Sequence, residues 1–288
     1  MAADRRLASY ARLPRAYRDR TVLHSTVDAF GRAHWLLCGA RSRHGPYDAL
    51  VVTVEGDYAD ETRLSAVGSR HPMIGALPAG GFVLADARSD TGDDQVQVFD
   101  ALGRPSSAFR VGDGIQHLLT DASGDLWIGY FDEGVLGDRL SAPGVRRWSS
   151  TGEPLWTYSP GPGARHIVDC YALNVDRRAA WVYPYTDFPL LEVRDGRPTR
   201  VRTSPVRSAH GILVHGERVA FFGGSLDAHD RLVTGRLTDT AVDPLATTRL
   251  TRPDGTPLGR RRVVCRGSRL YVQEQPGTEW TLFDLSRQ

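Results

Sequence analysis

SGDLWIGY (123–130) is a turn followed by a short strand with an aromatic centre, and five other segments of the chain have the same form. They are GRAHWLLCG (31–39), AGGFVLAD (79–86), RRAAWVYPY (177–185), GERVAFFGG (216–224) and GSRLYVQE (267–274). The residues at the six centres are Trp35, Phe82, Trp127, Trp181, Ala220 and Tyr271, and they lie 47, 45, 54, 39 and 51 residues apart. Recurrence at such a period indicates a repeat architecture.

Two further elements recur in phase with these strands. An apolar segment precedes each centre, as in IQHLLTD (115–121), and an apolar strand with a Gly turn follows it, as in VQVFDALGRP (96–105). Each repeat therefore predicts four antiparallel strands in about 47 residues, which is the pattern of a propeller blade. Six blades fill the chain, so the predicted fold is all-β, a six-bladed β-propeller with its large central side chains buried between blades.

The two ends of the chain fit the closure of such a fold. The last repeat ends at TLFDL (281–285) without a fourth strand, and RLASYARL (6–13) near the N-terminus is an alternating run. We therefore predict that Leu7 to Leu13 forms the outer strand of the sixth blade. No linker interrupts the repeats, which favours a single domain over 1–288; a β-sandwich, two small β-domains and a seven-bladed propeller are the alternatives.

Charge and composition exclude several classes of protein. The chain has 36 basic and 34 acidic residues, a net charge of +2, and every basic residue is arginine. This balance argues against a dedicated nucleic-acid or membrane-surface protein, in which one sign of charge dominates a face. At 41% hydrophobic and 24% charged residues, the composition is that of a globular protein.

The cysteines and the N-terminus bear on the cellular compartment. Cys38, Cys170 and Cys265 are far apart and form no C-x-x-C pair, so they predict buried free thiols and neither a redox pair nor a zinc site. The first 20 residues contain no apolar run of the signal-peptide type, and no segment has the length of a membrane span. The expected location is cytoplasmic.

Four blocks in the middle of the chain carry a resemblance. They are GDGIQH (112–117), YFDEGVLG (130–137), DCYALNV (169–175) and YTDF (185–188). The chain resembles a group of uncharacterised bacterial proteins that have similar GDGI, YFDEGVFG and DCYALNV blocks and look like β-propellers. The resemblance implies the fold and no activity, because a fold does not determine a function.

Histidines recur with the same period as the blades. His24, His71, His117, His166 and His210 stand near the starts of the predicted inner strands, 47, 46, 49 and 44 residues apart, and Arg260 to Arg262 take this position in the sixth repeat. If the inner strands line a channel, His71, His117, His166 and His210 could converge on a divalent metal ion such as Zn, Fe, Cu, Ni or Mn. The alternative is that each imidazole is structural and hydrogen-bonds within its own blade.

The loops that follow the aromatic strands are rich in carboxylates and phenols, above all in the third and fourth blades. We predict a pocket with seven candidate catalytic residues, which are Asp132, Glu133, His166, Asp169, Tyr171, Tyr185 and Asp187. Acid, imidazole and phenol groups together suit proton transfer. The alternative for the aspartates is turn capping. Arginines of these loops could bind an anionic substrate or form rim ion pairs; they are Arg41, Arg43, Arg88, Arg165 and Arg207.

The sequence contains no nucleophile elbow, phosphate loop, dinucleotide fingerprint or zinc-protease helix. The prediction is therefore a small-molecule binder or an enzyme of the lyase or hydrolase type, with or without a metal, that takes a small polar molecule at the channel mouth. The alternative is a WD40-like protein-interaction scaffold without catalytic activity, and a structural or immunity-type partner protein is a third reading. No nucleic acid or membrane partner is expected, whereas a protein partner remains open.

Overall fold

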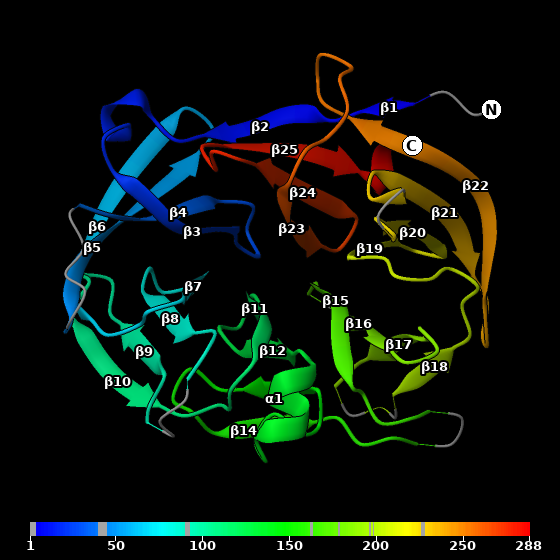
Figure 1. Cartoon of the computed structure of the whole chain (residues 1–288), viewed down its shortest axis with the longest axis horizontal. Coiled ribbons are helices and arrows are strands. Elements are labelled where there is room, and N and C mark those ends of the chain that lie inside the picture. The colour runs from blue at the N-terminus through cyan, green and yellow to red at the C-terminus, as the bar shows by residue number, and fades with distance from the viewer. Residues whose placement is uncertain are drawn as a thin grey trace. The chain divides into compact units, whose positions relative to one another are not determined.

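The structure is a computed structural model that describes residues 4–39, 45–89, 93–161, 164–177, 179–195, 197, 199–225 and 228–288 (Figure 1). Apart from strands, these residues form the α-helix α1 (Asp132–Gly137) and the 3-10 helices η1 (Arg15–Tyr17) and η3 (Leu285–Arg287). None of the helices in these ranges is long and apolar enough to cross a membrane.

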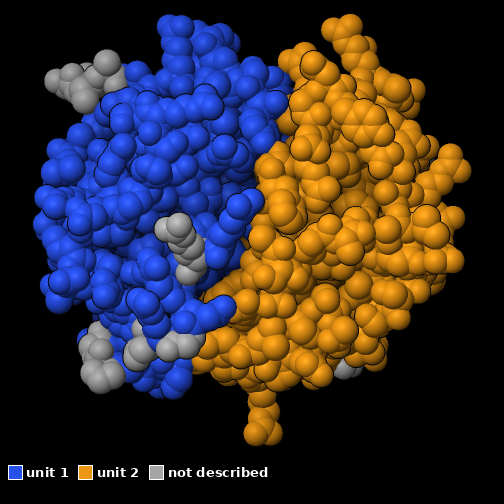
Figure 2. All heavy atoms as spheres, turned by 180° about the vertical axis from the view of Figure 1, so that it is seen from behind, with its two compact units in different colours: residues 1–10, 159–288 blue, residues 11–158 orange. Residues whose placement is uncertain are grey.

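The chain forms two compact units, which Figure 2 colours separately. Unit 2 comprises residues 11–158, and unit 1 comprises residues 1–10 together with 159–288. Each unit contains three four-stranded antiparallel blades, and each is described by itself.

Unit 2 contains blades 1 to 3. Blade 1 consists of β3 (Thr21–Val27), β4 (Ala33–Cys38), β5 (Tyr47–Glu55) and β6 (Tyr58–Val67). Blade 2 consists of β7 (Pro72–Ala76), β8 (Phe82–Asp86), β9 (Val96–Phe99) and β10 (Pro105–Phe109). Blade 3 consists of β11 (Ile115–Thr120), β12 (Leu126–Tyr130), β13 (Val145–Trp148) and β14 (Pro154–Thr157), with α1 inserted between β12 and β13.

Unit 1 contains blades 4 to 6. Blade 4 consists of β15 (Asp169–Val175), β16 (Ala180–Tyr185), β17 (Leu190–Val193) and β18 (Arg200–Arg202). Blade 5 consists of β19 (Gly211–His215), β20 (Arg218–Phe222), β21 (Arg231–Leu237) and β22 (Val242–Thr251). Blade 6 consists of β23 (Arg261–Arg266), β24 (Arg269–Glu274) and β25 (Glu279–Asp284), and its fourth strand is β2 (Ala8–Arg12). The fold is the predicted six-bladed β-propeller.

The N-terminal segment completes blade 6, as predicted. Strand β2 lies beside β25 at the outer edge of the blade, and Tyr10 packs its ring 4.9 Å from that of Tyr271. The preceding β1 (Arg5–Arg6) is an addition that the repeat pattern did not predict, because it pairs in parallel with β22 of blade 5. Leu7, between the two strands, is buried and donates its N–H to the Thr251 carbonyl at 2.9 Å.

The repeated centres form the core. Trp35, Trp127 and Trp181 expose 0%, 5% and 3% of their surface, which confirms the prediction that they are buried. The centres of the other three blades are buried as well, and all three cysteines are buried free thiols. The long interval between Trp127 and Trp181 arises because α1 and the extended segment before β15 add residues to that repeat.

Aspartates close the turns between neighbouring strands of a blade. Asp28 accepts the N–H groups of Phe30 and Arg32 between β3 and β4, and Asp121 accepts those of Ser123 and Asp125 between β11 and β12. Such local acceptors replace backbone partners in a tight turn, which is why aspartate recurs there.

The buried carboxylate of Asp28 predicts a pH dependence of stability. Burial alone would raise the pKa of Asp28, but the hydrogen bond and charge of His34 and the Arg32 guanidinium outweigh it and lower the pKa to about 2. A carboxyl whose pKa is lower in the folded state stabilises the protein above its unfolded pKa, and this contribution is lost as the pH falls through about 2.

We expect Asp28→Asn to cost about 2 kcal/mol of unfolding free energy at neutral pH. The difference from the parent should shrink as the pH falls from about 4 to about 2, because protonated Asp28 then resembles asparagine. Urea denaturation at several pH values measures it, with Asp57→Asn in the exposed β5–β6 turn as the control. A difference that stays constant over this range would contradict the role assigned to Asp28.

Candidate functional site

The in-phase histidines differ in their surroundings. In unit 2, His24 accepts the Ile74 N–H at Nδ1 (3.3 Å), which links blades 1 and 2. The exposed His71 places Nδ1 3.5 Å from Asp86 Oδ1 of its own blade. His117 is half-buried within β11 and lies opposite Gly129 of β12. The contact of His71 is of the kind that the structural interpretation predicts, whereas the hydrogen bond of His24 reaches a neighbouring blade.

In unit 1, His166 is exposed before β15, and His210 immediately precedes β19. Within the described part of the chain, no three His, Cys, Asp or Glu side chains gather in a way that could hold a metal ion. The metal site predicted at His71, His117, His166 and His210 therefore gains no support from the geometry.

The predicted catalytic residues are divided between the units. Asp132 and Glu133 belong to unit 2, where both are exposed in the first turn of α1. Asp132 Oδ1 accepts the Glu133 N–H at 2.8 Å, and Glu133 pairs with Arg88. The Arg88 guanidinium also lies over the Phe131 ring, 4.3 Å from its centre. The pair thus begins a helix, and Glu133 makes an ion pair; turn capping was the alternative to the predicted catalytic role.

The other predicted residues belong to unit 1, where Tyr171, Tyr185, Phe188 and His210 form one aromatic cluster. The Tyr171 ring is the centre, 6.2 Å from Tyr185, 5.0 Å from Phe188 and 5.5 Å from His210. The His210 and Tyr171 planes are inclined by only 11°, so the imidazole is stacked on the phenol. Blades 4 and 5 therefore bring together one imidazole and two phenols that the sequence had singled out.

A cavity of about 410 Å³ lies on the Tyr185 side of this cluster. It is lined by His166, Tyr185 and Asp187, three of the predicted residues, together with Arg165 and Arg207. Arg165 pairs with the Asp187 carboxylate at 3.1 Å, and Arg207 Nη1 donates to the Asp187 carbonyl at 2.7 Å. Asp169 lies beside this region at the start of β15, opposite Tyr185. The cations of this cavity thus already have acceptors.

A second cavity, of about 510 Å³, lies on the His210 side, between blades 5 and 6. We call it the His210 cavity. Its polar side chains are His210, His229, Arg260 and Arg261, and its apolar ones are Phe222, Leu258 and Val263. Three glycines complete the wall: Gly223, Gly224 and Gly259. The volume is that of a site for a small molecule.

The local backbone structure places His210 at the wall of this cavity. Its N–H donates to the Phe222 carbonyl at 2.8 Å, so the residue continues the pairing between β19 and β20. Gly223 follows with φ of +94°, and a Cβ there would lie 3.3 Å from His210 Cδ2. The left-handed backbone and the close approach of the imidazole both require glycine at this position.

Arg261 contributes a guanidinium to the same cavity at the start of β23. Its Cζ lies 5.6 Å from the centre of the Phe222 ring. Its Nη1 is buried and makes no hydrogen bond with any residue that the structure describes. Burial lowers the pKa of Arg261, against the opposing charges of Glu274 and Asp230. A buried guanidinium nitrogen without an acceptor is energetically costly unless an anionic or carbonyl oxygen binds to it.

The environment lowers the pKa of His210. His210 is exposed by its fractional surface, but nearby protein atoms partly desolvate the ring, and the Arg261 charge adds to the effect. Both causes disfavour the imidazolium form. His210 is therefore a neutral imidazole at neutral pH, able to accept a proton or to donate one hydrogen bond and accept another.

This coupling can be measured. We expect Arg261→Gln to raise the pKa of His210 toward its ordinary value, because the substitution removes a neighbouring positive charge and leaves the burial in place. An NMR titration of the imidazole signals measures the pKa. Arg236→Gln, at an exposed position paired with Glu217, is the control. An equal pKa in the parent and in Arg261→Gln would refute the electrostatic coupling of these two groups.

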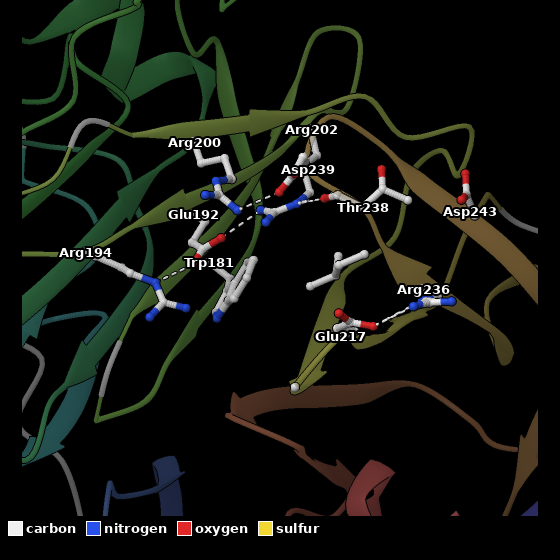
Figure 3. Close-up of a pocket in the computed structure, with 12 residues that line it drawn as sticks. Trp181, Glu192, Arg194, Arg200, Arg202, Glu217, Arg236, Thr238, Asp239 and Asp243 are labelled. Atoms are coloured by element: carbon white, nitrogen blue, oxygen red, sulfur yellow. Dashed lines mark hydrogen bonds and ion pairs between the residues drawn. The ribbon is translucent and has the colours of Figure 1, made fainter.

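A third cavity, of about 450 Å³, lies between blades 4 and 5 and is lined by four arginines and four carboxylates (Figure 3). Glu192 is buried and binds both Arg194 and Arg202, and these hydrogen bonds lower its pKa although burial opposes them. Arg236 binds Glu217 at 2.8 Å. The charges of this cavity are thus compensated within it, in contrast to those of the His210 cavity.

Sequence reasoning found some arginines of these sites and missed the role of others. Arg88 and Arg165 make ion pairs, which is the rim pairing that was weighed against substrate binding, whereas Arg207 donates to backbone carbonyls. Arg41 and Arg43 lie outside the described residues. The signal for Arg261 was its place in the sixth repeat, where the other repeats have histidine, although Arg260 and Arg262 share that signal.

Comparisons with known proteins support the fold. No protein-family model matches the chain, and no curated protein does. The chain is similar to virginiamycin B lyase from Staphylococcus aureus, with 9% identity and a TM-score of 0.51 over 94% of this chain and 98% of that one. A streptogramin B lyase is 10% identical, with a TM-score of 0.50 over 96% of this chain and 97% of that one. The β-propeller domain of the trilobed protease from Pyrococcus furiosus is 12% identical, with a TM-score of 0.50 over 93% of this chain and 83% of that one. At such identities the similarity shows the β-propeller fold alone.

Proposed function

We propose that the protein binds a small molecule in the His210 cavity, next to the aromatic cluster of blades 4 and 5. The observation that carries this proposal is the stacked, neutral imidazole of His210 at the wall of a cavity of about 510 Å³. Polar groups that converge on a partly apolar concave surface are typical of ligand sites. A protein-interaction scaffold has no need of such a cavity.

The same groups suit proton transfer of the lyase or hydrolase type. A neutral imidazole is a general base at neutral pH, and its stacking on Tyr171 holds the ring plane in place. The nearby Arg261 guanidinium would stabilise negative charge that develops on a bound molecule. Two of the compared structures are lyases by name, and their similarity to this chain extends to the fold only.

The test uses three probes of equal size, benzamide, benzoate and benzylamine, which are neutral, anionic and cationic. We expect at least one of them to shift the NMR signals of the His210 ring saturably. Val263→Phe should abolish the shift because the larger side chain fills the cavity. Val201→Phe, which fills the Tyr185-side cavity from β18, is the matched control and should leave the shift in place. The absence of a saturable shift with all three probes would refute the proposal.

A further inference from the structure

The carboxylates nearest to Arg261 are bound to other arginines. Glu274 lies directly opposite Arg261 in the β23–β24 ladder. Its two oxygens accept hydrogen bonds from Arg252, at 2.8 and 3.0 Å, and one of them also accepts the Gly259 N–H. Both oxygens of Glu274 are thus engaged by the bidentate pair with Arg252.

Asp230 is the second acidic group whose charge acts on Arg261. It is buried, and its ion pair is with Arg249, at 3.3 Å. Neither carboxylate accepts a hydrogen bond from the buried Nη1 of Arg261, and Arg261 lines the His210 cavity.

The charge of the cavity wall has one sign. Its described lining residues include the two cations Arg260 and Arg261 and no aspartate or glutamate. The Tyr185-side cavity contains Asp187, and the cavity between blades 4 and 5 contains a carboxylate for every arginine. Among the three, the described wall of the His210 cavity has the largest excess of arginines over carboxylates, two against one in the Tyr185-side cavity, and such a wall attracts an anion.

Three side chains of the cavity wall are apolar. Phe222, Leu258 and Val263 line the cavity, and Phe222 also faces the Arg261 guanidinium. A bare inorganic anion would leave this surface unfilled, whereas a molecule with an apolar body would remove it from water. The ligand that fits is therefore a molecule with both an anionic group and an apolar body.

We propose that the His210 cavity takes a small molecule with an anionic group, a carboxylate or a phosphoryl group, bound by Arg261, and an apolar body packed against Phe222, Leu258 and Val263. This assignment rests on the proposed function, because it names the class of ligand for the same cavity. Arg261 is the residue that selects for charge, and its planar fork matches either oxyanion in a bidentate manner.

The experiment compares affinities of the same probes. Benzoate and benzamide have the same shape and differ in charge, so their ratio of dissociation constants isolates the contribution of the anionic group. We expect benzoate to bind at least about tenfold more tightly than benzamide to the parent protein, and benzylamine to bind least. In Arg261→Gln the ratio should fall to near one. Arg236→Gln, in the compensated cavity, should leave it unchanged.

Two further measurements keep the outcomes separate. Phenylphosphonate in place of benzoate shows whether the site prefers a phosphoryl group or a carboxylate, and Arg261→Lys, which keeps the charge without the fork, should lose part of the preference. Equal binding of benzoate and benzamide to the parent would overturn the anion assignment and leave the proposed function standing. Loss of binding by every probe would overturn both. The comparison of benzoate with benzamide on the parent protein does not depend on the folding of any variant.

Discussion

Replacing Trp35 by alanine is expected to lower the free energy of unfolding by about 3–5 kcal/mol. Trp35 is fully buried in β4, opposite Ser25 of β3 and Val52 of β5. Both neighbouring strands are paired along their length, so the backbone cannot collapse into the space that the indole leaves. The loss therefore combines the transfer free energy of the ring with the cost of a cavity.

Urea denaturation followed by far-UV circular dichroism measures this effect. The control is Leu136→Ala in α1, where the side chain is 79% exposed and the change should stay within about 0.5 kcal/mol. If Trp35→Ala and Leu136→Ala destabilised the protein equally, the placement of Trp35 in the core of blade 1 would be wrong.

Asn174→Leu is expected to cost about 3 kcal/mol, although leucine has nearly the shape of asparagine. Asn174 is fully buried in β15, and its Nδ2 donates to the carbonyls of Ile212 and Gly267 at 2.7 and 2.8 Å. Its Oδ1 accepts the Gly267 N–H at 2.7 Å. One amide thus connects the inner strands of blades 4 and 5 with the β23–β24 turn of blade 6, and leucine leaves buried backbone groups without these partners.

A second variant separates hydrogen bonding from volume. Asn174→Asp keeps the Oδ1 acceptor but directs an oxygen at the two carbonyls, so at neutral pH it should be at least as destabilising as Asn174→Leu. The exposed Gln116→Leu in β11 controls for an amide-to-leucine change and should be nearly neutral. Equal stability of Asn174→Leu and Gln116→Leu would refute the connecting role of Asn174.

The period of the histidines predicted where in each repeat a histidine stands, but it did not predict which face of the strand its side chain takes. A β-bulge lies between Val22 and His24, and another between Ile115 and His117. Successive side chains of a strand alternate between its faces, so one extra residue changes the face that a histidine takes. A spacing in the sequence does not contain this information. His24, which follows such a bulge, bonds to a neighbouring strand, whereas His210, which lies just before β19, stacks on Tyr171.

The blade number, the buried centres such as Trp127 and Trp181, and the closing strand near Leu7 followed from the sequence alone. They depend on hydrophobic pattern and turn residues, which are local and recur with each repeat. The surroundings of Arg261 depended on the tertiary structure. All 36 basic residues are arginine, and only the folded chain shows that Arg252 binds Glu274 while Arg261 lines the cavity with a buried Nη1 that has no hydrogen-bond partner among the described residues. Ion pairs form between strands distant in sequence, and their choice of partner is decided by packing.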